Sequence, residues 1–457
     1  MYDASVRHDT ARRGLRFLPV LAGVELTPPT RTRRVLPLAA GEAPRPRHAV
    51  WELTSACDQR CVHCGPRSGA RRSDELSTEE CLRLCDELAA AGVGEVTLIG
   101  GEAYLRPDLL LIVRKLREHG ITPTLTTGGY NLTRELADGL VEAGIRSVSV
   151  SIDGLAACHD ALRGRPHSFE RAFGALRHLR AAGSQIACNS QINARTLADL
   201  EGLLERLAPE GIHAWQVQLT LAHGVAADHP EILLQPFQMI EMYAVLERLL
   251  ARCEALGIRL YPGNSVGYFG PLEARLRRNS TQRGFYNGCQ AGVAALGIES
   301  HGKLKGCPSL GGRANDGGNW REHGLAAAWQ RAPELAYNRG RGVDTLWGFC
   351  AGCYYAPVCL GGCTSVSEPL LGRPGNNPMC IHRALELDAA GLRERLEPVA
   401  AAPGEPFDHG LLRLIREHKD PALRERLGPV QVDEPRSSRA DEPAGAGTPL
   451  PRADASE

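Results

Sequence analysis

The sequence predicts an α/β protein with a partial (βα)6 TIM-like barrel, followed by a cysteine-rich domain and a C-terminal helix. Apolar strand-like and amphipathic helix-like segments alternate from His48 to about residue 284. Such alternation is typical of parallel strands joined by right-handed crossovers. Six units fall short of the eight that close a barrel. Beyond residue 285 the alternation gives way to glycines, cysteines and short segments.

The expected strands and helices follow one another at regular intervals. Ser77 to Glu80 form a capping box at the start of the first helix. Seven strands are expected, at 48–54, 95–99, 121–127, 146–152, 185–193, 214–221 and 258–262. The helices between them are expected at 77–91, 107–119, 132–144, 168–182, 196–208 and 236–256.

The chain divides into five expected parts. Residues 1–47 are an Arg- and Pro-rich N-terminal extension, and 48–284 form the barrel. The cysteine-rich domain covers 285–385 and is expected to need metal to fold. Residues 386–430 are expected to be a helical segment, with a helix running through 381–396. The tail at 431–457 has the composition of a disordered segment.

Composition narrows the class of protein. Lys+Arg and Asp+Glu both number 53, so there is no electrostatic argument for nucleic acid or an anionic membrane. No run of about 18 apolar residues indicates a transmembrane helix, and the N-terminus lacks a signal-peptide core. Fifteen cysteines in so long a chain favour reduced thiols in the cytoplasm over a disulfide framework. Five scattered ones are expected to be small buried hydrophobes: Cys81, Cys85, Cys158, Cys188 and Cys253.

The first cysteine group is Cys57-x3-Cys61-x2-Cys64, directly after the first strand. Four thiolates would saturate a [4Fe-4S] cluster, whereas three leave one iron free to bind a small molecule. The alternative is a zinc site completed by His63.

This loop resembles the cluster loop of the radical S-adenosylmethionine (SAM) superfamily. Gly100-Gly101-Glu102, after the second strand, looks like the GGE motif that holds the SAM amino group. The resemblance implies that SAM is contacted from later strand ends by Ser149, Ser151, Asp153 and Asn189, with Thr126–Gly129 and Asn193 nearby. His63 stands where the family has an aromatic or apolar residue near the adenine. The family cleaves SAM reductively to a 5′-deoxyadenosyl radical.

The second cysteine group resembles the SPASM domain, the auxiliary-cluster extension of one radical SAM subfamily. Its spacing is Cys289 to Cys307, then Cys350-x2-Cys353-x5-Cys359-x3-Cys363, then Cys380. The resemblance implies two auxiliary [4Fe-4S] clusters. Cys350, Cys353, Cys359 and Cys380 would hold one, and Cys289, Cys307 and Cys363 the other. The eighth ligand is missing, so that position is open or is filled by a scattered cysteine, a carboxylate or His301. Zinc is the alternative here too.

The resemblance implies an enzyme that modifies a peptide or protein, forming a thioether, a carbon–carbon crosslink or an epimer. Alternatives are a maturase of a partner enzyme (sulfatase or quinohemoprotein type), a cofactor-biosynthesis enzyme or a heme-modifying enzyme. A non-catalytic iron–sulfur carrier is a further hypothesis. The implied redox partner is a reductant such as ferredoxin or flavodoxin. Because 47 residues are too few for a winged-helix module, the substrate is expected to be recognised by a separate leader-binding protein, by the N-terminal arm or by the surface of the SPASM domain.

Overall fold

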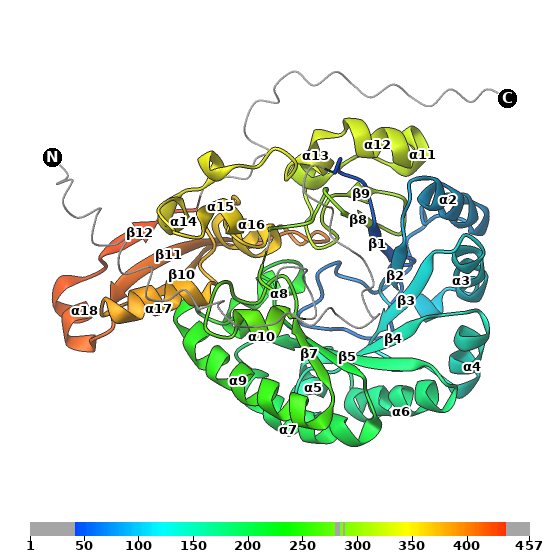
Figure 1. Cartoon of the computed structure of the whole chain (residues 1–457), viewed down its shortest axis with the longest axis horizontal. Coiled ribbons are helices and arrows are strands. Elements are labelled where there is room, and N and C mark those ends of the chain that lie inside the picture. The colour runs from blue at the N-terminus through cyan, green and yellow to red at the C-terminus, as the bar shows by residue number, and fades with distance from the viewer. Residues whose placement is uncertain (1–41, 279–283, 287, 436–457) are drawn as a thin grey trace.

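The core of the molecule is a curved sheet with helices on its outer face. The structure is a computed structural model that describes residues 42–278, 284–286 and 288–435. Within them, nine strands pair in the order β7-β6-β5-β4-β3-β2-β1-β8-β9 (Figure 1). Neighbours from β7 to β8 are parallel, and only the short β9 is antiparallel. The sheet is therefore a partial barrel, as predicted.

All seven predicted strands form in the predicted order. Buried apolar residues alternate with partly exposed ones along several of them, as in β4, where Val148 and Val150 are fully buried and Ser149 and Ser151 are partly exposed. The bounds are β1 His48–Glu52, β2 Glu95–Ile99, β3 Thr122–Thr127, β4 Ser147–Ser151, β5 Gln185–Ile192, β6 Ala214–Leu219 and β7 Arg259–Pro262.

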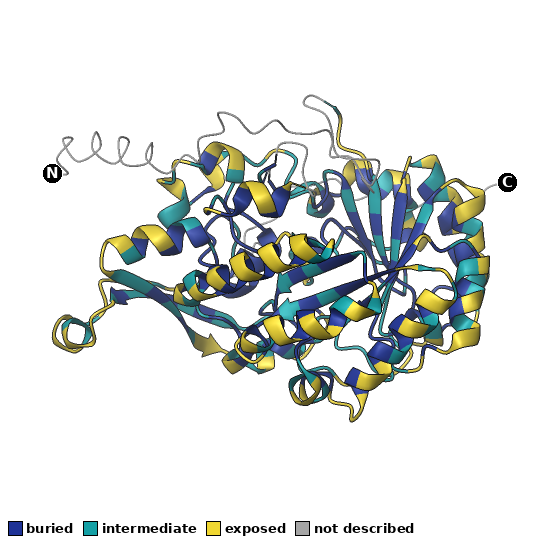
Figure 2. Cartoon of the chain, turned by 60° about the horizontal axis from the view of Figure 1, so that its bottom comes forward, coloured by how far each residue is buried: buried dark blue, intermediate teal, exposed yellow. Residues whose placement is uncertain are grey.

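The helices between the strands bury one face against the sheet and expose the other to solvent (Figure 2). The buried positions are mostly apolar. In α2, Ser77 and Glu80 form the predicted capping box, and Leu84 and Leu88 are fully buried. Burying each leucine contributes roughly 1.5–3 kcal/mol. The barrel helices are α2 Thr78–Ala90, η2 Ala103–Leu105, α3 Leu109–Glu118, α4 Arg134–Glu142, α5 Ala156–Arg163, α6 Ser168–Ala181, η3 Leu197–Asp199, α7 Leu200–Leu207, η4 Ala208–Glu210, α8 Val225–Asp228, η5 Pro230–Ile232, η6 Pro236–Gln238 and α9 Met239–Leu256.

The cysteine-rich segment shares the barrel sheet instead of forming a separate body. Strand β8 (Ala295–Ile298) pairs in parallel with β1, and β9 (Leu304–Lys305) pairs with β8. A Cβ on Gly297 would lie 2.7 Å from the Cα of Pro308, so glycine lets the loop carrying Cys307 lie on the sheet. The expected domain boundary at 284/285 therefore separates segments of the chain that belong to the same β-sheet.

Short helices make up the rest of this segment. Trp320 and Leu325 pack into the same hydrophobic core as the barrel. These helices are α10 Glu273–Arg277, η7 Arg313–Asn315, α11 Trp320–His323, α12 Leu325–Arg331, α13 Pro333–Ala336, η8 Val343–Thr345, α14 Gly348–Ala351, α15 Ala356–Cys359 and α16 Thr364–Leu371.

The expectation of a helical segment over 386–430 is wrong. Helix α17 (Ile381–Ala389) ends before Gly391, which has φ +72°. Strand β10 (Leu392–Ala400) follows and pairs with β11 (Leu411–His418). In β10 the buried residues Glu394 and Leu396 alternate with the partly exposed Arg393, Arg395 and Glu397. This period of two suits a half-buried strand, but the sequence does not show it as an apolar pattern because Glu394 is charged. Helix α18 (Pro421–Leu427) follows β11.

The two ends of the chain are described only in part. Gln431–Asp433 form strand β12 against β11, so the expected disorder of 431–457 does not begin at residue 431. At the other end, Arg47 donates its N–H to the carbonyl of Ala294. Residues 1–41 and 436–457, with most of both expected terminal segments, lie outside the described residues. No helix among the described residues is long and apolar enough to cross a membrane.

Candidate functional site

The loop that carries Cys57, Cys61 and Cys64 is fixed against the end of β2 by two glycines. The Gly101 N–H donates to the Thr54 carbonyl and the Glu102 N–H to the Ala56 carbonyl, each at 2.7 Å. A Cβ on Gly101 would lie 2.1 Å from the Ala56 oxygen. Only glycine permits this approach, so the predicted GGE motif positions the cysteine loop as well as its own glutamate.

Helix α5 holds the other side of this loop, and sequence reasoning missed it. The N–H groups of Arg60 and Val62 donate to the carbonyls of Arg163 and Leu162, at 3.0 and 2.9 Å. Gly164 caps the helix at φ +59°, and a Cβ there would lie 2.3 Å from the Arg60 oxygen. Leu162 and Arg163 in the last turn, followed by Gly164, form a helix C-terminal signal that could have revealed α5 in the sequence.

The structure brings the three expected ligands of the first cluster together. Burial raises the pKa of the Cys57 thiol to about 12 and that of Cys61 to about 11, and the Cys64 pKa is also raised by burial. The negative charge of a neighbouring cysteine or carboxylate raises the pKa of each thiol further. Such thiols stay protonated until a metal displaces the protons.

Hydrogen-bond donors already surround the sulfurs. Backbone N–H groups lie 3.4 Å from the Cys57 sulfur and 3.3 Å from that of Cys64, donated by Gln59 and Ser68. The Arg163 guanidinium is 3.9 Å from the Cys61 sulfur. Donors of this kind stabilise cluster thiolates and help set the cluster potential. The residues present therefore fit an iron–sulfur cluster.

Asp153, an expected SAM contact, lies behind the cysteine loop. Its carboxylate accepts from Arg163 at 2.6 Å and from the Gln191 N–H at 2.8 Å, and it lies 3.2 Å from His63. Burial alone would raise its pKa, but Arg163 and His63 hold it well below the usual range. The structure thus places Asp153 where it orients Arg163 beside Cys61.

The other expected strand-end residues fall into two groups. Ser149 on β4 donates to the side-chain oxygen of Asn189 on β5 at 2.8 Å, and Ser151 pairs in register with Asn189. Asn193 is fully buried and binds Thr220 and the turn at 195–196. Ser149, Ser151 and Asn189 therefore lie together on the adjacent strands β4 and β5, whereas Asn193 holds the turn that follows β5.

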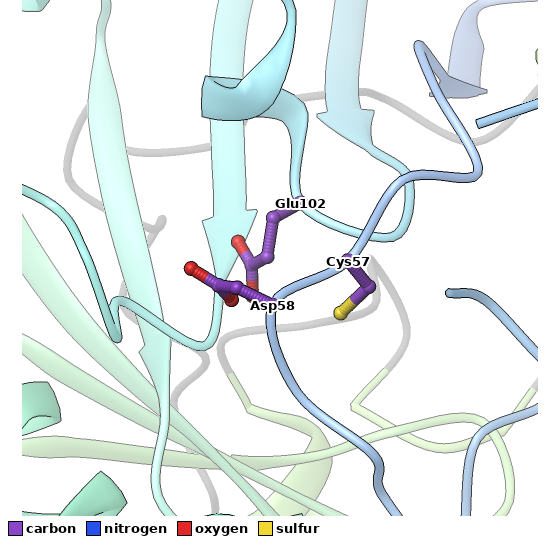
Figure 3. A group of neighbouring side chains, drawn as sticks. All are labelled: Cys57, Asp58 and Glu102. Carbon is purple, nitrogen blue, oxygen red and sulfur yellow. The ribbon is translucent and has the colours of Figure 1, made fainter. Parts of the chain in front are cut away.

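Two carboxylates converge beside Cys57 (Figure 3). Ligand atoms of Cys57, Asp58 and Glu102 all lie within 4.8 Å of one another. Glu102 accepts hydrogen bonds from the Thr127 hydroxyl and the Gly128 N–H. Burial raises the pKa of Glu102 to about 7 against these hydrogen bonds. Neutral donors and a second acid make this a place where an ammonium group is favourable.

Asp58 was not singled out from the sequence. It accepts from the Tyr104 hydroxyl and the Asn131 amide, both at 2.7 Å. Its position directly after Cys57 was visible in the sequence, but its proximity to Glu102 depends on the meeting of two loops.

Four later cysteines line one cavity. Cys350, Cys353, Cys359 and Cys380 face it together with Gly361, Gly362 and Arg383. The Asn377 N–H lies 3.4 Å from the Cys350 sulfur. A Cβ on Gly362 would lie 2.8 Å from the Tyr268 ring, so glycines keep the cradle open. Burial raises the pKa of the Cys380 thiol to about 12. This donor set fits a four-cysteine cluster.

Cys289, Cys307 and Cys363 form the remaining group. Cys289 raises the pKa values of Cys307 and Cys363, so the three thiols share one neighbourhood, where burial is the larger cause. The Ser365 hydroxyl lies 3.1 Å from the Cys363 sulfur. His301, one expected candidate for the eighth ligand, instead lies 3.8 Å from Glu299 and near Arg72 and Asp74.

The scattered cysteines are mostly core residues. Cys81, Cys85, Cys188 and Cys253 are buried, as expected, but Cys158 is half-buried. Its sulfur lies 3.4 Å from the carbonyl of Arg195.

The chain belongs to the radical SAM superfamily, in its SPASM-domain subfamily. Residues 51–207 match the family model of the Radical SAM superfamily. The mycofactocin maturase MftC of Mycobacterium ulcerans is 31% identical over 351 residues, covering 73% of this chain and 87% of the relative. The AdoMet-dependent heme synthase of Methanosarcina barkeri is 29% identical over 349 residues, covering 74% and 97%. The protein is therefore an enzyme that uses a [4Fe-4S] cluster and SAM, and auxiliary clusters are typical of its subfamily.

Solved structures share the fold. Streptococcus suis SuiB bound to S-adenosylmethionine superposes with a TM-score of 0.58 at 17% identity, covering 74% of this chain and 76% of SuiB. Native anSMEcpe with bound AdoMet gives 0.58 at 17% identity, covering 74% and 94%.

Proposed function

We propose that this enzyme modifies a peptide or protein by radical SAM chemistry, with three iron–sulfur clusters. One observation carries the proposal: the ten clustered cysteines gather in three groups around one barrel and its extension. When bound, the first cluster supplies the electron that cleaves SAM to a 5′-deoxyadenosyl radical. The product is a thioether, a carbon–carbon crosslink or an epimer.

The chain's own residues have distinct proposed roles. Cys57, Cys61 and Cys64 hold the first cluster, with Arg163 as a donor beside it. Glu102 and the backbone of Gly100–Gly101 hold the SAM amino group, and Ser149, Ser151 and Asn189 face the rest of the cofactor. Asp153 acts through Arg163. The two later groups hold the auxiliary clusters.

A peptide substrate is supported by two relatives. MftC is named a maturase, and one SuiB structure contains the precursor peptide SuiA. The SuiB structures share only the fold at 16–17% identity. A ferredoxin or flavodoxin as reductant and a separate leader-binding protein belong to the same proposal.

A heme-modifying activity is the second candidate. The observation that favours it is the 29% identity to an AdoMet-dependent heme synthase over 97% of that relative. Incubating the reduced enzyme with candidate precursor peptides and, separately, with iron porphyrins would distinguish the two, because only the true substrate changes mass.

Anaerobic reconstitution tests the chemistry. We expect about 10 to 12 irons per chain from three clusters and dithionite-dependent release of 5′-deoxyadenosine. Replacing Cys57, Cys61 and Cys64 by Ala should remove about four irons and all SAM cleavage. The matched control is Cys253→Ala, a buried cysteine outside all three groups. SAM cleavage by the triple variant would refute the first ligand set, and a total near four irons would refute the auxiliary clusters.

A further inference from the structure

The loop at 401–410, between β10 and β11, reaches across to the segment that follows Cys64. The Phe407 N–H donates to the Gly65 carbonyl, and the Gly224 N–H donates to the Asp408 carbonyl, both at 2.8 Å. Arg67 binds the Asp408 carboxylate at 3.0 Å. The C-terminal sheet therefore places one loop directly at the first cluster loop.

The ring of Phe407 fills the space between the two cysteine loops. It lies over Lys305, whose ammonium nitrogen is 3.4 Å from the ring centroid, and 6.1 Å from the ring of His223. A Cβ on Gly65 would be 3.4 Å from the ring, and one on Gly311 would be 2.6 Å from the Phe407 Cβ. Gly65 follows Cys64 directly and Gly311 comes four residues after Cys307, so the ring lies between the first cluster loop and the loop that follows Cys307.

The polar groups around this ring are poorly satisfied. Both ring nitrogens of His223 are buried, and within the described residues they have no hydrogen-bond partner. Lys305 is 1% exposed and forms an ion pair with Glu299 at 3.0 Å. Phe407 itself has φ +56°, a conformation that costs energy for a side chain of this size. Buried polar atoms without partners and a strained residue together indicate a position built for another occupant.

The charges around the ring favour a neutral aromatic occupant. Lys305 already pairs with Glu299 and also lies near the buried carboxyl of Glu52, so a further buried carboxylate would be uncompensated. The ammonium faces the ring, a geometry in which aromatic groups are attracted to cations. His223 offers one donor or acceptor at each nitrogen, which a polar substituent on the aromatic ring could use.

We propose that Lys305, His223 and Gly65 form a subsite for an aromatic side chain of the substrate, and that Phe407 occupies this subsite until the substrate displaces it. The proposal rests on the peptide-modifying function above and adds a residue-level specificity to it. The subsite lies beside the first cluster loop, so an aromatic residue held there is presented next to the chemistry.

Removing the Phe407 ring tests the subsite. We expect the reconstituted Phe407→Ala enzyme to bind p-cresol at least tenfold more tightly than the wild type in calorimetry. In the Phe407→Ala background, His223→Leu should abolish the preference for p-cresol over toluene. Val399→Ala, on the same hairpin and 45% exposed, is the matched control and should behave as wild type. No gain in p-cresol binding, or equal binding of toluene and p-cresol by Phe407→Ala, would overturn the proposal.

A measurement on the wild type covers the case in which Phe407→Ala does not fold. Displacement requires the Phe407 amide to exchange with deuterium at least a hundredfold faster than the amides of β4 and β5. Equal protection would show that the loop is a fixed part of the core. SAM cleavage is measured separately, so a failed cleavage assay with intact p-cresol binding would reject the proposed function and leave the subsite standing.

Discussion

At the scale of single residues, the site depends on buried charges that compensate one another. Arg163 and Asp153 are both buried and form an ion pair at 2.6 Å behind Cys61. Pairing keeps Asp153 ionised in the interior, where an unpaired carboxylate would be costly. The proposed role of this pair is to position the loop that carries Cys61, so its effects should appear first in stability and in cluster retention.

We expect Arg163→Met to lower the free energy of unfolding of the apoprotein by about 3–5 kcal/mol, because it leaves Asp153 buried without its cation. Urea denaturation measures the change. The control, Arg165→Met, removes an exposed arginine two residues away that lies over the ring of Tyr130, and should lower stability by no more than about 1 kcal/mol. Equal effects of the two substitutions would contradict the pairing argument.

Glu52 should make stability depend on pH. Burial raises its pKa from 4.5 to about 7, against the nearby charge of Lys305. The folded state therefore holds a proton that the unfolded state releases, and stability falls as pH rises from 4.5 to 7. Glu52→Gln removes the titrating carboxyl and with it this pH dependence. The substitution should therefore raise the free energy of unfolding by about 3 kcal/mol more at pH 8 than at pH 5. Unfolding curves at the two pH values check this, and an identical effect at both would refute it.

At the scale of elements, glycines decide where the cysteine loops lie. Gly101 and Gly164 each let a backbone carbonyl of the 54–60 segment approach closer than any Cβ would allow. The residues that follow β2 and the last residues of α5 thus hold the same cysteine loop from two sides.

Gly101→Ala should therefore displace the loop, because its Cβ would lie 2.1 Å from the Ala56 oxygen. We expect a loss of about four irons after reconstitution and a lower melting temperature. Gly174→Ala is the control: it lies in α6 with nothing within 4 Å of the new Cβ, and should stabilise the helix by roughly 0.5–1 kcal/mol. Full iron content in Gly101→Ala would show that the loop tolerates the shift.

The same elements show what the sequence could and could not predict. The seven strands were predictable because each is a short segment between turn residues that is either apolar or alternates apolar and polar residues, as in SVSVS. Strand β10 was misread as helix because Leu392 and Leu396 suit a helical period of four as well as an alternating strand. The proximity of Arg163 to Cys61, or of Phe407 to Lys305, joins segments about 100 residues apart and leaves no local pattern.

At the scale of the whole molecule, one sheet joins the barrel to the cysteine-rich segment. Strands β8 and β9 extend the barrel sheet beside β1, and a carboxyl-terminal loop returns to the first cluster loop. The barrel helices bury long rows of leucines, whereas α14 and α15 are single turns around four cysteines. The two regions should therefore differ in how far they depend on iron.

Removing iron should unfold the cysteine-rich segment before the barrel. Helices α14 (Gly348–Ala351) and α15 (Ala356–Cys359) have few apolar contacts of their own, so metal binding supplies much of their folding free energy. After oxidation and chelation, amides at 348–360 should lose hydrogen-exchange protection, while those of β2 to β5 keep theirs. Replacing Cys350 and Cys353 by Ala should give the same pattern without a chelator. Simultaneous loss of protection in both regions would mean instead that the shared sheet couples them into one cooperative unit.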